Sequence, residues 1–356
     1  MNKKLISRVK VFLRPLRNFY RAFVWLFFFP KKATSADVLL VYDTASQPYS
    51  VGDLLILQVS SNIFTCKSKY KSVDVAFNYN KDNPSQCDKV FKGVVTSDNV
   101  ISHLFRIIPI LNFNSNLNQF YIFSGFSNLF DYINQKSYKF IYPSPYVMAS
   151  KSYITPLIFD EVIYPFFIEN GYVPPLVPKI DLILWANEFL STHFGKEAIV
   201  VTINIRNNLG WSSERNSKVD AWIKLFEKCA NIENLIFLVI CDKGEIPINV
   251  KFHNVFFAKN YLTSLDQDMA LIYAADFHMG SNSGPTNVAI FNNKPYRLFN
   301  IDFDKSNIYK NNILEKIDDD YHKFIFSNSS QKIYGKSENF EIIHYNFLEM
   351  FRELKK

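Results

Sequence analysis

Short runs of β-branched and aromatic residues alternate with helix-like stretches along the chain after Lys32. This alternation is typical of βαβ units, in which helices connect successive parallel strands. It therefore predicts an α/β fold. The chain has 356 residues, and at about 100–200 residues per domain this length is enough for two such domains.

The predicted elements follow this alternation through both halves of the chain. In the first half, strands are predicted at Val38–Asp43, Val73–Asn78, Val90–Thr96, Gln119–Ser124 and Lys139–Tyr142, and helices near Asp53–Ser61, Asn99–Leu111 and Asn128–Gln135. In the second half, an amphipathic run at Ile180–His193 precedes strands at Ala198–Ile205, Leu235–Cys241, Phe277–Gly280 and Tyr296–Asn300, with a further run at Asn254–Ala258. Helices are predicted there at Lys218–Cys229, Ser264–Ala275 and Thr286–Phe291.

Prolines mark the boundary between the two halves. Seven of the fifteen prolines lie between Pro143 and Pro178, and such a density disfavours long regular elements. We predict a proline-rich linker over residues 151–178, between Rossmann-like domains over 33–150 and 179–356. A cleft between these domains is the expected ligand site, because open α/β sheets bind ligands beyond the carboxyl ends of their strands.

The net charge of +7 is concentrated at the N-terminus. Of the 40 basic residues, nine lie in residues 1–32, which contain no acid, leaving 31 basic against 33 acidic residues in the rest of the chain. A nucleic-acid partner is therefore not expected, because such a domain carries a basic face of its own. The four cysteines are widely separated, which favours a reducing cytoplasmic compartment over a disulfide framework.

Residues 1–32 combine these basic side chains with an aromatic run, Phe19–Phe29. Its uncharged part, Ala22–Phe29, is far shorter than the roughly 20 residues of a spanning helix. Basic residues next to Trp and Phe are typical of an interfacial amphipathic helix. We predict membrane association at the inner face of the cytoplasmic membrane. A helix that docks on the protein itself and a signal peptide are the alternatives.

The richest motif follows the predicted strand Phe277–Gly280. Small and hydroxyl-bearing residues there precede a predicted helix, and the exposed amides at such a helix start can bind an anion such as a diphosphate. The alternative is an ordinary helix start, with Ser283 as cap and Pro285 at the first helical position. The candidate anion-binding residues are Gly280, Ser281, Asn282, Ser283, Gly284, Pro285, Thr286 and Asn287.

This stretch resembles the G-N/T-D-S-G-P-x-H-x-A segment, with its later proline, of GT-B glycosyltransferases. The resemblance is greatest to the bacterial heptosyltransferase-like enzymes of glycosyltransferase family nine. It implies that these residues hold the diphosphate of a nucleotide-sugar donor, which is a co-substrate, with no cofactor and no metal. Asn282 replaces the usual Asp, and Asn287 stands where the family often has His.

Two further stretches resemble parts of GT-B enzymes. Ser50-Val-Gly-Asp53 after the first strand is similar to the S-x-G-D opening of the same family, which implies that Asp53 is the general base; the alternative is an N-cap. The loop from Thr44 to Tyr49 is longer than is usual in that family. The end of the strand at Ala198–Ile205 is similar to capsule-type members that place an Arg beside the phosphates, which implies donor contacts from Arg206 and the adjacent Asn207, unless Arg206 is a surface residue closing the strand.

Other candidates are weaker. Asp302–Asp304 has the form of a DxD motif, Asp318–Asp320 reads as a solvated turn, and His278 is read as structural. Motifs of P-loop kinases, dehydrogenases, zincins and serine hydrolases are absent from the sequence.

Together these features predict a glycosyltransferase that moves a sugar from a nucleotide-diphosphate donor to a glycan or lipid-linked acceptor in bacterial surface-polysaccharide synthesis. The resemblance implies an inverting, metal-independent reaction. A non-catalytic GT-B scaffold or glycan-binding subunit is one alternative, and a sugar-nucleotide epimerase is another.

Overall fold

The computed structural model describes residues 34, 36–66, 70–82, 84, 95–144, 153–207, 215–241, 252–301 and 313–354. The predicted membrane-association helix and the DxD motif lie outside the described residues, as does most of the strand predicted at Val90–Thr96. The chain divides into two compact units. Unit 1 comprises residues up to Ile108 and Asn116–Ile158, and unit 2 comprises Pro109–Ser115 and the chain from Phe159 onward.

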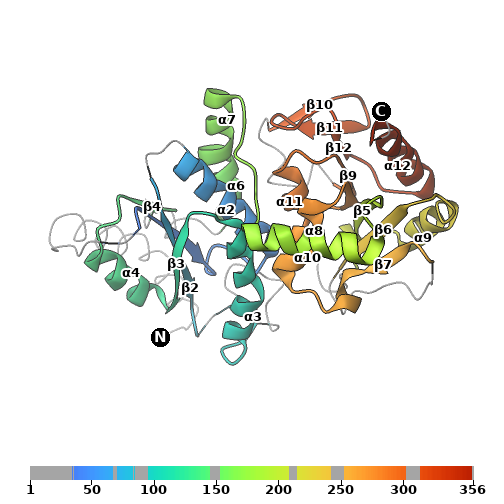
Figure 1. The fold of residues 1–356 in the computed structure, drawn as a ribbon. Coiled ribbons are helices and arrows are strands. Elements are labelled where there is room, and N and C mark those ends of the chain that lie inside the picture. The colour runs from blue at the N-terminus through green and yellow to red at the C-terminus, as the bar shows by residue number, and fades with distance from the viewer. Residues whose placement is uncertain are drawn as a thin grey trace, which may run out of the picture. The chain divides into compact units, whose positions relative to one another are not determined.

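Unit 1 contains a parallel sheet whose described strands have the order β3-β2-β1-β4 (Figure 1). The strands are β1 (Val38–Asp43), β2 (Val73–Tyr79), β3 (Leu117–Ser124) and β4 (Phe140–Tyr142). The helices between them are α2 (Val51–Cys66), α3 (Val100–Ile107) and α4 (Phe126–Gln135), and the 3-10 turn at Ile108–Phe113 after α3 belongs to unit 2 from Pro109 onward. Every residue of β1 is buried, as expected for a central parallel strand covered on both faces.

Unit 2 contains a larger mixed sheet, with described strands in the order β10-β11-β12-β9-β8-β5-β6-β7 (Figure 1). Strands β5 to β9 and β12 pair in parallel, whereas β10, β11 and β12 form an antiparallel extension. The strands are β5 (Ile199–Asn204), β6 (Leu235–Ile240), β7 (Val255–Phe257), β8 (Phe277–Ser281), β9 (Tyr296–Phe299), β10 (Leu314–Lys316), β11 (Tyr321–Phe324) and β12 (Gln331–Tyr334). The helices are α8 (Ile180–Phe194), α9 (Val219–Lys228), a 3-10 turn at Ala258–Tyr261, α10 (Leu265–Ala274), α11 (Thr286–Ile290) and α12 (Phe340–Leu354).

The two sheets with alternating helices confirm the predicted α/β fold. The start of α10 illustrates how local sequence sets an element: Ser264 accepts a hydrogen bond from the Gln267 N–H, and the Gln267 side chain bonds back to the Ser264 N–H. This capping box satisfies two amides that a helix start leaves unpaired.

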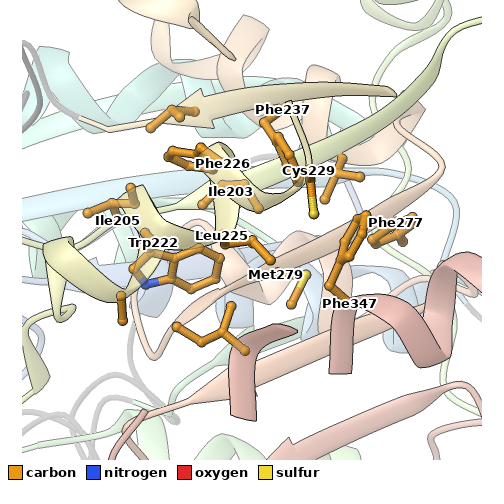
Figure 2. Close-up of a cluster of buried hydrophobic side chains, with 14 of the residues drawn as sticks. Ile203, Ile205, Trp222, Leu225, Phe226, Cys229, Phe237, Phe277, Met279 and Phe347 are labelled. Carbon is orange, nitrogen blue, oxygen red and sulfur yellow. The ribbon is translucent and has the colours of Figure 1, made fainter. Parts of the chain in front are cut away.

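The core of unit 2 forms where α9 and α12 pack on one face of the sheet (Figure 2). Trp222 and Phe226 of α9 and Phe347 of α12 meet Phe237 of β6 and Phe277 of β8, and each of these side chains is fully buried. Burying aromatic side chains of this size provides much of the driving force for folding.

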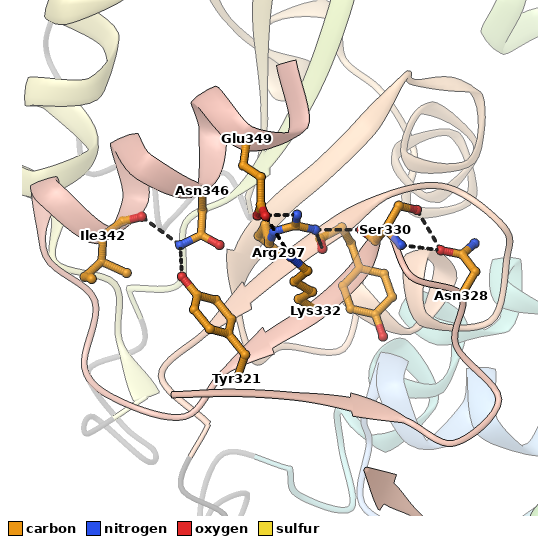
Figure 3. A network of polar contacts seen from close by, with 9 residues as sticks. Arg297, Tyr321, Asn328, Ser330, Lys332, Ile342, Asn346 and Glu349 are labelled. Carbon is orange, nitrogen blue, oxygen red and sulfur yellow. Dashed lines mark hydrogen bonds and ion pairs between the residues drawn. The ribbon is translucent and has the colours of Figure 1, made fainter. Parts of the chain in front are cut away.

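A polar network joins α12 to β9 and β12 (Figure 3). Arg297 of β9 is 1% exposed, and its guanidinium forms an ion pair of 2.7 Å with Glu349 of α12 and donates to the Ser330 carbonyl at 2.6 Å. Lys332 of β12 pairs with the other oxygen of Glu349 at 2.7 Å. The buried arginine therefore has charged and neutral partners that fix α12 against the sheet.

Part of the predicted proline-rich linker is helical. Short helical pieces follow one another as α6 (Thr155–Ile158), a π-helical turn (Phe159–Ile163) and α7 (Tyr164–Asn170). Pro156 and Pro165 are tolerated because each lies in the first turn of its helix, where a backbone N–H is not needed. Gly171, with φ +75°, ends α7 in the left-handed conformation, and no regular element follows until α8.

Candidate functional site

The strand order of unit 2 indicates where a ligand is expected. From β5 the chain adds β6 and β7 on one side and then returns to add β8 and β9 on the other. The order thus reverses between β5 and β8, and such switch points are where open α/β sheets bind ligands, beyond the carboxyl ends of the strands. Asn204, the last residue of β5, pairs there with Gly280 of β8.

Gly280 is required for this close pairing. A Cβ atom at this position would lie 2.6 Å from the Asn204 carbonyl oxygen and 2.9 Å from the Asn204 Cβ. The Asn204 side chain donates to the Ile240 carbonyl of β6 at 2.9 Å and accepts a hydrogen bond from the Ser283 hydroxyl. The ends of β5, β6 and β8 are therefore tied to the loop that follows β8.

That loop presents backbone donors. The Ser283 and Gly284 N–H groups donate to no acceptor within the part of the chain that the structure describes, and both residues are only half-buried. The Asn287 side chain, also half-buried, has no hydrogen-bond partner among the described residues. These groups can receive an anion without breaking an existing bond.

The start of α11 differs from an ordinary helix start with Ser283 as cap and Pro285 as the first helical residue. Pro285 is the N-cap rather than the first helical residue of α11, and the helix has no side-chain cap hydrogen bond. The Ser283 hydroxyl bonds to Asn204 instead, so its interpretation as a cap is wrong. Thr286 closes the turn, since its hydroxyl donates to the Ser283 carbonyl at 2.6 Å.

Two arginines lie in the hydrogen-bond network around this loop. Arg215 donates to the Asn282 carbonyl at 2.6 Å. Arg206 is 7% exposed, and its guanidinium donates to the Asn216 side chain. Its interpretation as a surface residue is therefore wrong. Asn207 follows it and is half-buried.

Beneath the loop, a second network joins three strand ends. The hydroxyls of Ser281 and Ser217 lie 2.6 Å apart, and Ser217 accepts from the Arg206 N–H at 3.1 Å. Asn300, directly after β9, donates to Ser281 at 3.3 Å and to the Asn216 carbonyl at 3.2 Å. Its φ of +57° is left-handed, a conformation that asparagine tolerates better than most residues. The Glu338 N–H donates to the Asn300 side chain at 3.0 Å, which links this network to the segment before α12.

Asp53 lies in unit 1, in the first turn of α2. It is 7% exposed and its Oδ1 atom accepts from the hydroxyls of Tyr153, at 2.8 Å, and Thr155. The Ser50 hydroxyl accepts from the Asp53 N–H at 3.4 Å, so Ser50 rather than Asp53 takes the capping role. The alternative interpretation of Asp53 as an N-cap is therefore wrong.

Solved structures share this architecture, whereas no protein-family model and no curated protein sequence matches the chain. ADP-heptose LPS heptosyltransferase II from E. coli matches with a TM-score of 0.53 and 10% identity, over 90% of this chain and 100% of that chain. A glycosyl transferase family 9 protein from Veillonella parvula DSM 2008 matches with a TM-score of 0.48 and 10% identity, over 74% of this chain and 80% of that one. E. coli heptosyltransferase WaaC with ADP matches with a TM-score of 0.42 and 10% identity, over 73% and 86%.

This chain has the GT-B fold of the heptosyltransferases. The resemblance inferred from three short motifs is thereby confirmed at the level of the fold. In the GT-B frame, Gly280–Asn287 and Arg206 belong to unit 2 and Asp53 belongs to unit 1, and within each unit they follow parallel strands.

Sequence reasoning did not identify several residues of this GT-B site as candidates. Asn204, Arg215, Asn300 and Glu338 hold the loop or the strand ends, yet none belongs to the matched motif. Asn204 and Asn300 had a usable signal, because Asn204 is the polar last residue of the buried strand β5 and Asn300 directly follows β9. Glu338 had none, since its role depends on contacts with residues more than a hundred positions away.

Two other predictions have clear outcomes. His278 is fully buried in β8, its Nδ1 lies 3.0 Å from the Thr202 hydroxyl, and burial lowers its pKa to about 3, all consistent with a structural histidine. Asp318 accepts from the N–H groups of Asp320 and Tyr321, both at 2.8 Å, in the turn between β10 and β11, as predicted.

Among the described helices, none has the length and apolar character needed to cross a membrane.

Proposed function

We propose that the protein is a glycosyltransferase that moves a sugar from a nucleoside-diphosphate donor to a glycan or lipid-linked acceptor in surface-polysaccharide synthesis. The observation that carries the proposal is the pair of Ser283 and Gly284 amides, which donate to no acceptor among the described residues, at the switch point of the unit 2 sheet in a chain with the GT-B fold. The names of the similar structures support a nucleotide donor, because they mention ADP-heptose and ADP.

The negative charge that develops on the leaving diphosphate determines the proposed role of the donor-binding residues. When the acceptor oxygen attacks the anomeric carbon, the bond from that carbon to the diphosphate oxygen breaks and negative charge develops on the leaving diphosphate. The Ser283 and Gly284 N–H groups are fixed donors for that charge, and the Arg206 and Arg215 guanidinium groups supply positive charge in the same network. Fixed donors of this kind stabilise a transition state without reorganising.

The acceptor half requires a base. Asp53 is our candidate to take the hydroxyl proton, which would give an inverting displacement with no metal in its path. Its hydroxyl neighbours, Tyr153 and Thr155, hold the carboxylate in one orientation. We also propose that residues 1–32 hold the protein at the inner face of the cytoplasmic membrane, where lipid-linked acceptors are found.

The test measures nucleotide binding by the full chain. Binding is detected as a rise in the Tm of thermal unfolding in the presence of UDP, GDP, ADP, CMP or their sugars. A ligand that binds the folded state at 100 times its Kd adds about 2.7 kcal/mol of stability. We expect one nucleoside diphosphate to raise the Tm. Gly284→Asp, which puts a carboxylate beside the free amides, and Arg206→Ala should each weaken that binding at least tenfold.

Asn187→Asp is the matched control, because it adds the same charge at an exposed position of α8. It should bind as the unaltered protein does. If no nucleotide raises the Tm, the transferase proposal fails and a second candidate takes its place, a non-catalytic scaffold or glycan-binding subunit. The neutral Asn282 and Asn287, where the similar family has ionisable residues, favour that second candidate.

A further inference from the structure

Glu338 is a buried carboxyl that the proposed reaction does not use. It is 0% exposed and lies between β12 and α12. Its Oε1 atom accepts hydrogen bonds from the Lys218 N–H and, at 3.1 Å, from Trp222 Nε1. Its Oε2 atom is buried with no partner in the part of the chain that the structure describes. An ionised carboxylate in this position has only one of its two oxygens solvated by the protein, which is costly.

Glu338 supports the loop between β8 and α11, residues 282–285, from two directions. We call this loop the donor loop. Its carboxyl holds Lys218, the residue next to Ser217, while its backbone N–H holds Asn300, which donates to Ser281. The Ser217 and Ser281 hydroxyls then meet at 2.6 Å, which closes the ring of contacts. Ser281 is separated by one residue from Ser283, whose N–H donates to no acceptor among the described residues, so these contacts hold the strand end that carries the proposed diphosphate site.

The charge on Glu338 is poorly compensated. Burial raises its pKa to about 7, although the hydrogen bonds from the Lys218 N–H and Trp222, the nearby Asn300 side chain and the charge of Lys218 lower it. Among the described residues, Lys218, before α9, is the charged residue that lowers its pKa, and the neighbours supplied by α9 and by the end of β9, Trp222 and Asn300, are neutral. Burial therefore raises the pKa of this carboxyl well above that of an exposed glutamate.

We propose that Glu338 is a positioning residue for the donor loop, and that binding of a nucleoside diphosphate at Ser283 and Gly284 is coupled to uptake of a proton by the Glu338 carboxyl. The inference rests on the proposed function. A diphosphate brings negative charge to the site, and a second negative charge beneath it disfavours the ionised carboxylate. A proton from solvent then binds Oε2, while Oε1 keeps its two donors.

Linkage fixes the sign of the effect. Because the bound state holds the proton more tightly, affinity is highest at low pH and falls as pH rises through the pKa of the free protein and then that of the complex. If binding raises the pKa from about 7 by one unit, the affinity falls about fivefold between pH 7 and pH 9. In this range the terminal phosphate of a free nucleoside diphosphate is already ionised.

The experiment is isothermal titration of ADP, GDP and UDP into the full chain between pH 7 and pH 9, in two buffers of different ionisation enthalpy. The difference in heat between buffers counts protons taken up on binding. We expect uptake of a fraction of a proton near pH 8, together with the fall in affinity.

Two variants and a control sharpen the test. Glu338→Gln keeps the shape of the side chain but cannot take up the proton, so uptake should vanish and affinity should become independent of pH. Trp222→Phe removes a donor that lowers the pKa of Glu338, so the pH at which affinity falls should move upward. Glu349→Gln makes the same substitution in the same unit, in contact with Arg297 and Lys332, and should bind nucleotides with the same affinity, pH profile and proton uptake as the unaltered protein.

The outcomes separate this inference from the function on which it rests. If a nucleotide binds but Glu338→Gln keeps the same proton uptake, the inference is wrong and the donor site stands. If Glu338→Gln does not fold, an unchanged pH profile in Trp222→Phe overturns the inference in the same way. If none of the three nucleotides binds the unaltered chain, both proposals fail.

Discussion

At the scale of single residues, the proposed chemistry depends on Asp53. This carboxylate is nearly buried and accepts from two hydroxyls that belong to one short segment, Tyr153–Thr155. Each of these hydroxyls donates a hydrogen bond to Oδ1, and together they orient the carboxylate. A fixed orientation of this kind suits a base that must accept a proton from a bound acceptor.

We expect Asp53→Asn to lower the rate of glycosyl transfer by about 10²–10⁴-fold, as for loss of a general base. Nucleotide affinity and Tm should stay close to those of the unaltered protein. The amide keeps an oxygen that can accept from Tyr153 and Thr155 but cannot take the acceptor proton. Sugar transfer and nucleotide affinity are measured side by side. Asp37→Asn, which breaks an ion pair with Lys139 in the same unit, is the control and should transfer normally. Unchanged turnover in Asp53→Asn would exclude this residue as the base.

At the scale of elements, α12 is held to its sheet by a carboxylate at its centre. Partial burial raises the pKa of Glu349, but hydrogen bonds from Lys332 and Arg297 outweigh this, and the pKa lies below its usual value. Because the depressed pKa belongs to the folded state, the stability that Glu349 contributes is present above the unfolded pKa of about 4.5. It is lost as pH falls through the folded pKa.

Glu349→Gln should therefore lower the free energy of unfolding by about 1–3 kcal/mol at pH 7, because it leaves the buried Arg297 guanidinium without its charged partner. The difference from the unaltered protein should shrink as the pH falls below 4. Urea unfolding at a series of pH values measures this. Equal destabilisation at pH 7 and at pH 3 would show that the charge of Glu349 is not what holds α12.

At the scale of the whole molecule, the sequence separates a strongly basic segment from a nearly neutral remainder. Juxtamembrane basic residues contribute about 1 kcal/mol each when they lie near an anionic membrane surface. Screening by salt reduces that attraction. The distribution of charge thus allows membrane binding and nucleotide binding to be tested independently of each other.

Removal of residues 1–32 should abolish sedimentation with vesicles that contain phosphatidylglycerol, whereas the full chain should bind them and be released by high salt. Vesicles of phosphatidylcholine alone serve as the control and should bind much less. Nucleotide affinity should be the same with and without the segment. If the shortened protein still binds anionic vesicles, another surface makes the contact and the proposal for residues 1–32 is wrong.

The sequence predicted the regular part of the molecule well. β1 spans the predicted residues, and most other predicted strands and helices are present within a few residues of their expected limits, because hydrophobic periodicity is a local property. The helical pieces at Thr155–Asn170 were not predicted, because proline disfavours helix interiors. Here the prolines lie in first helical turns, where they are tolerated. The strands β10 to β12 were not predicted, since each has only three or four residues and the pairing partner of each determines its structure.

For the candidate site, the sequence identified the loop but not what holds it. The motif at Gly280–Asn287 is contiguous and can be recognised directly. The supports of the loop come from Asn204, Arg215 and Asn300, which are distant in sequence and become neighbours only through strand order. The free amides of Ser283 and Gly284 were predictable only in outline, because the loop conformation decides which N–H groups are paired.

The contact between Gly280 and Asn204 limits how a protein of this kind can diverge. Any side chain at position 280 must push β5 away, and the displacement would move Asn204 and with it the Ser283 hydroxyl. Related proteins that keep the loop after β8 are therefore expected to keep glycine at position 280. Position 287 is under no such restraint, since the Asn287 side chain has no partner among the described residues. Sequence change should therefore be tolerated more readily at position 287 than at position 280.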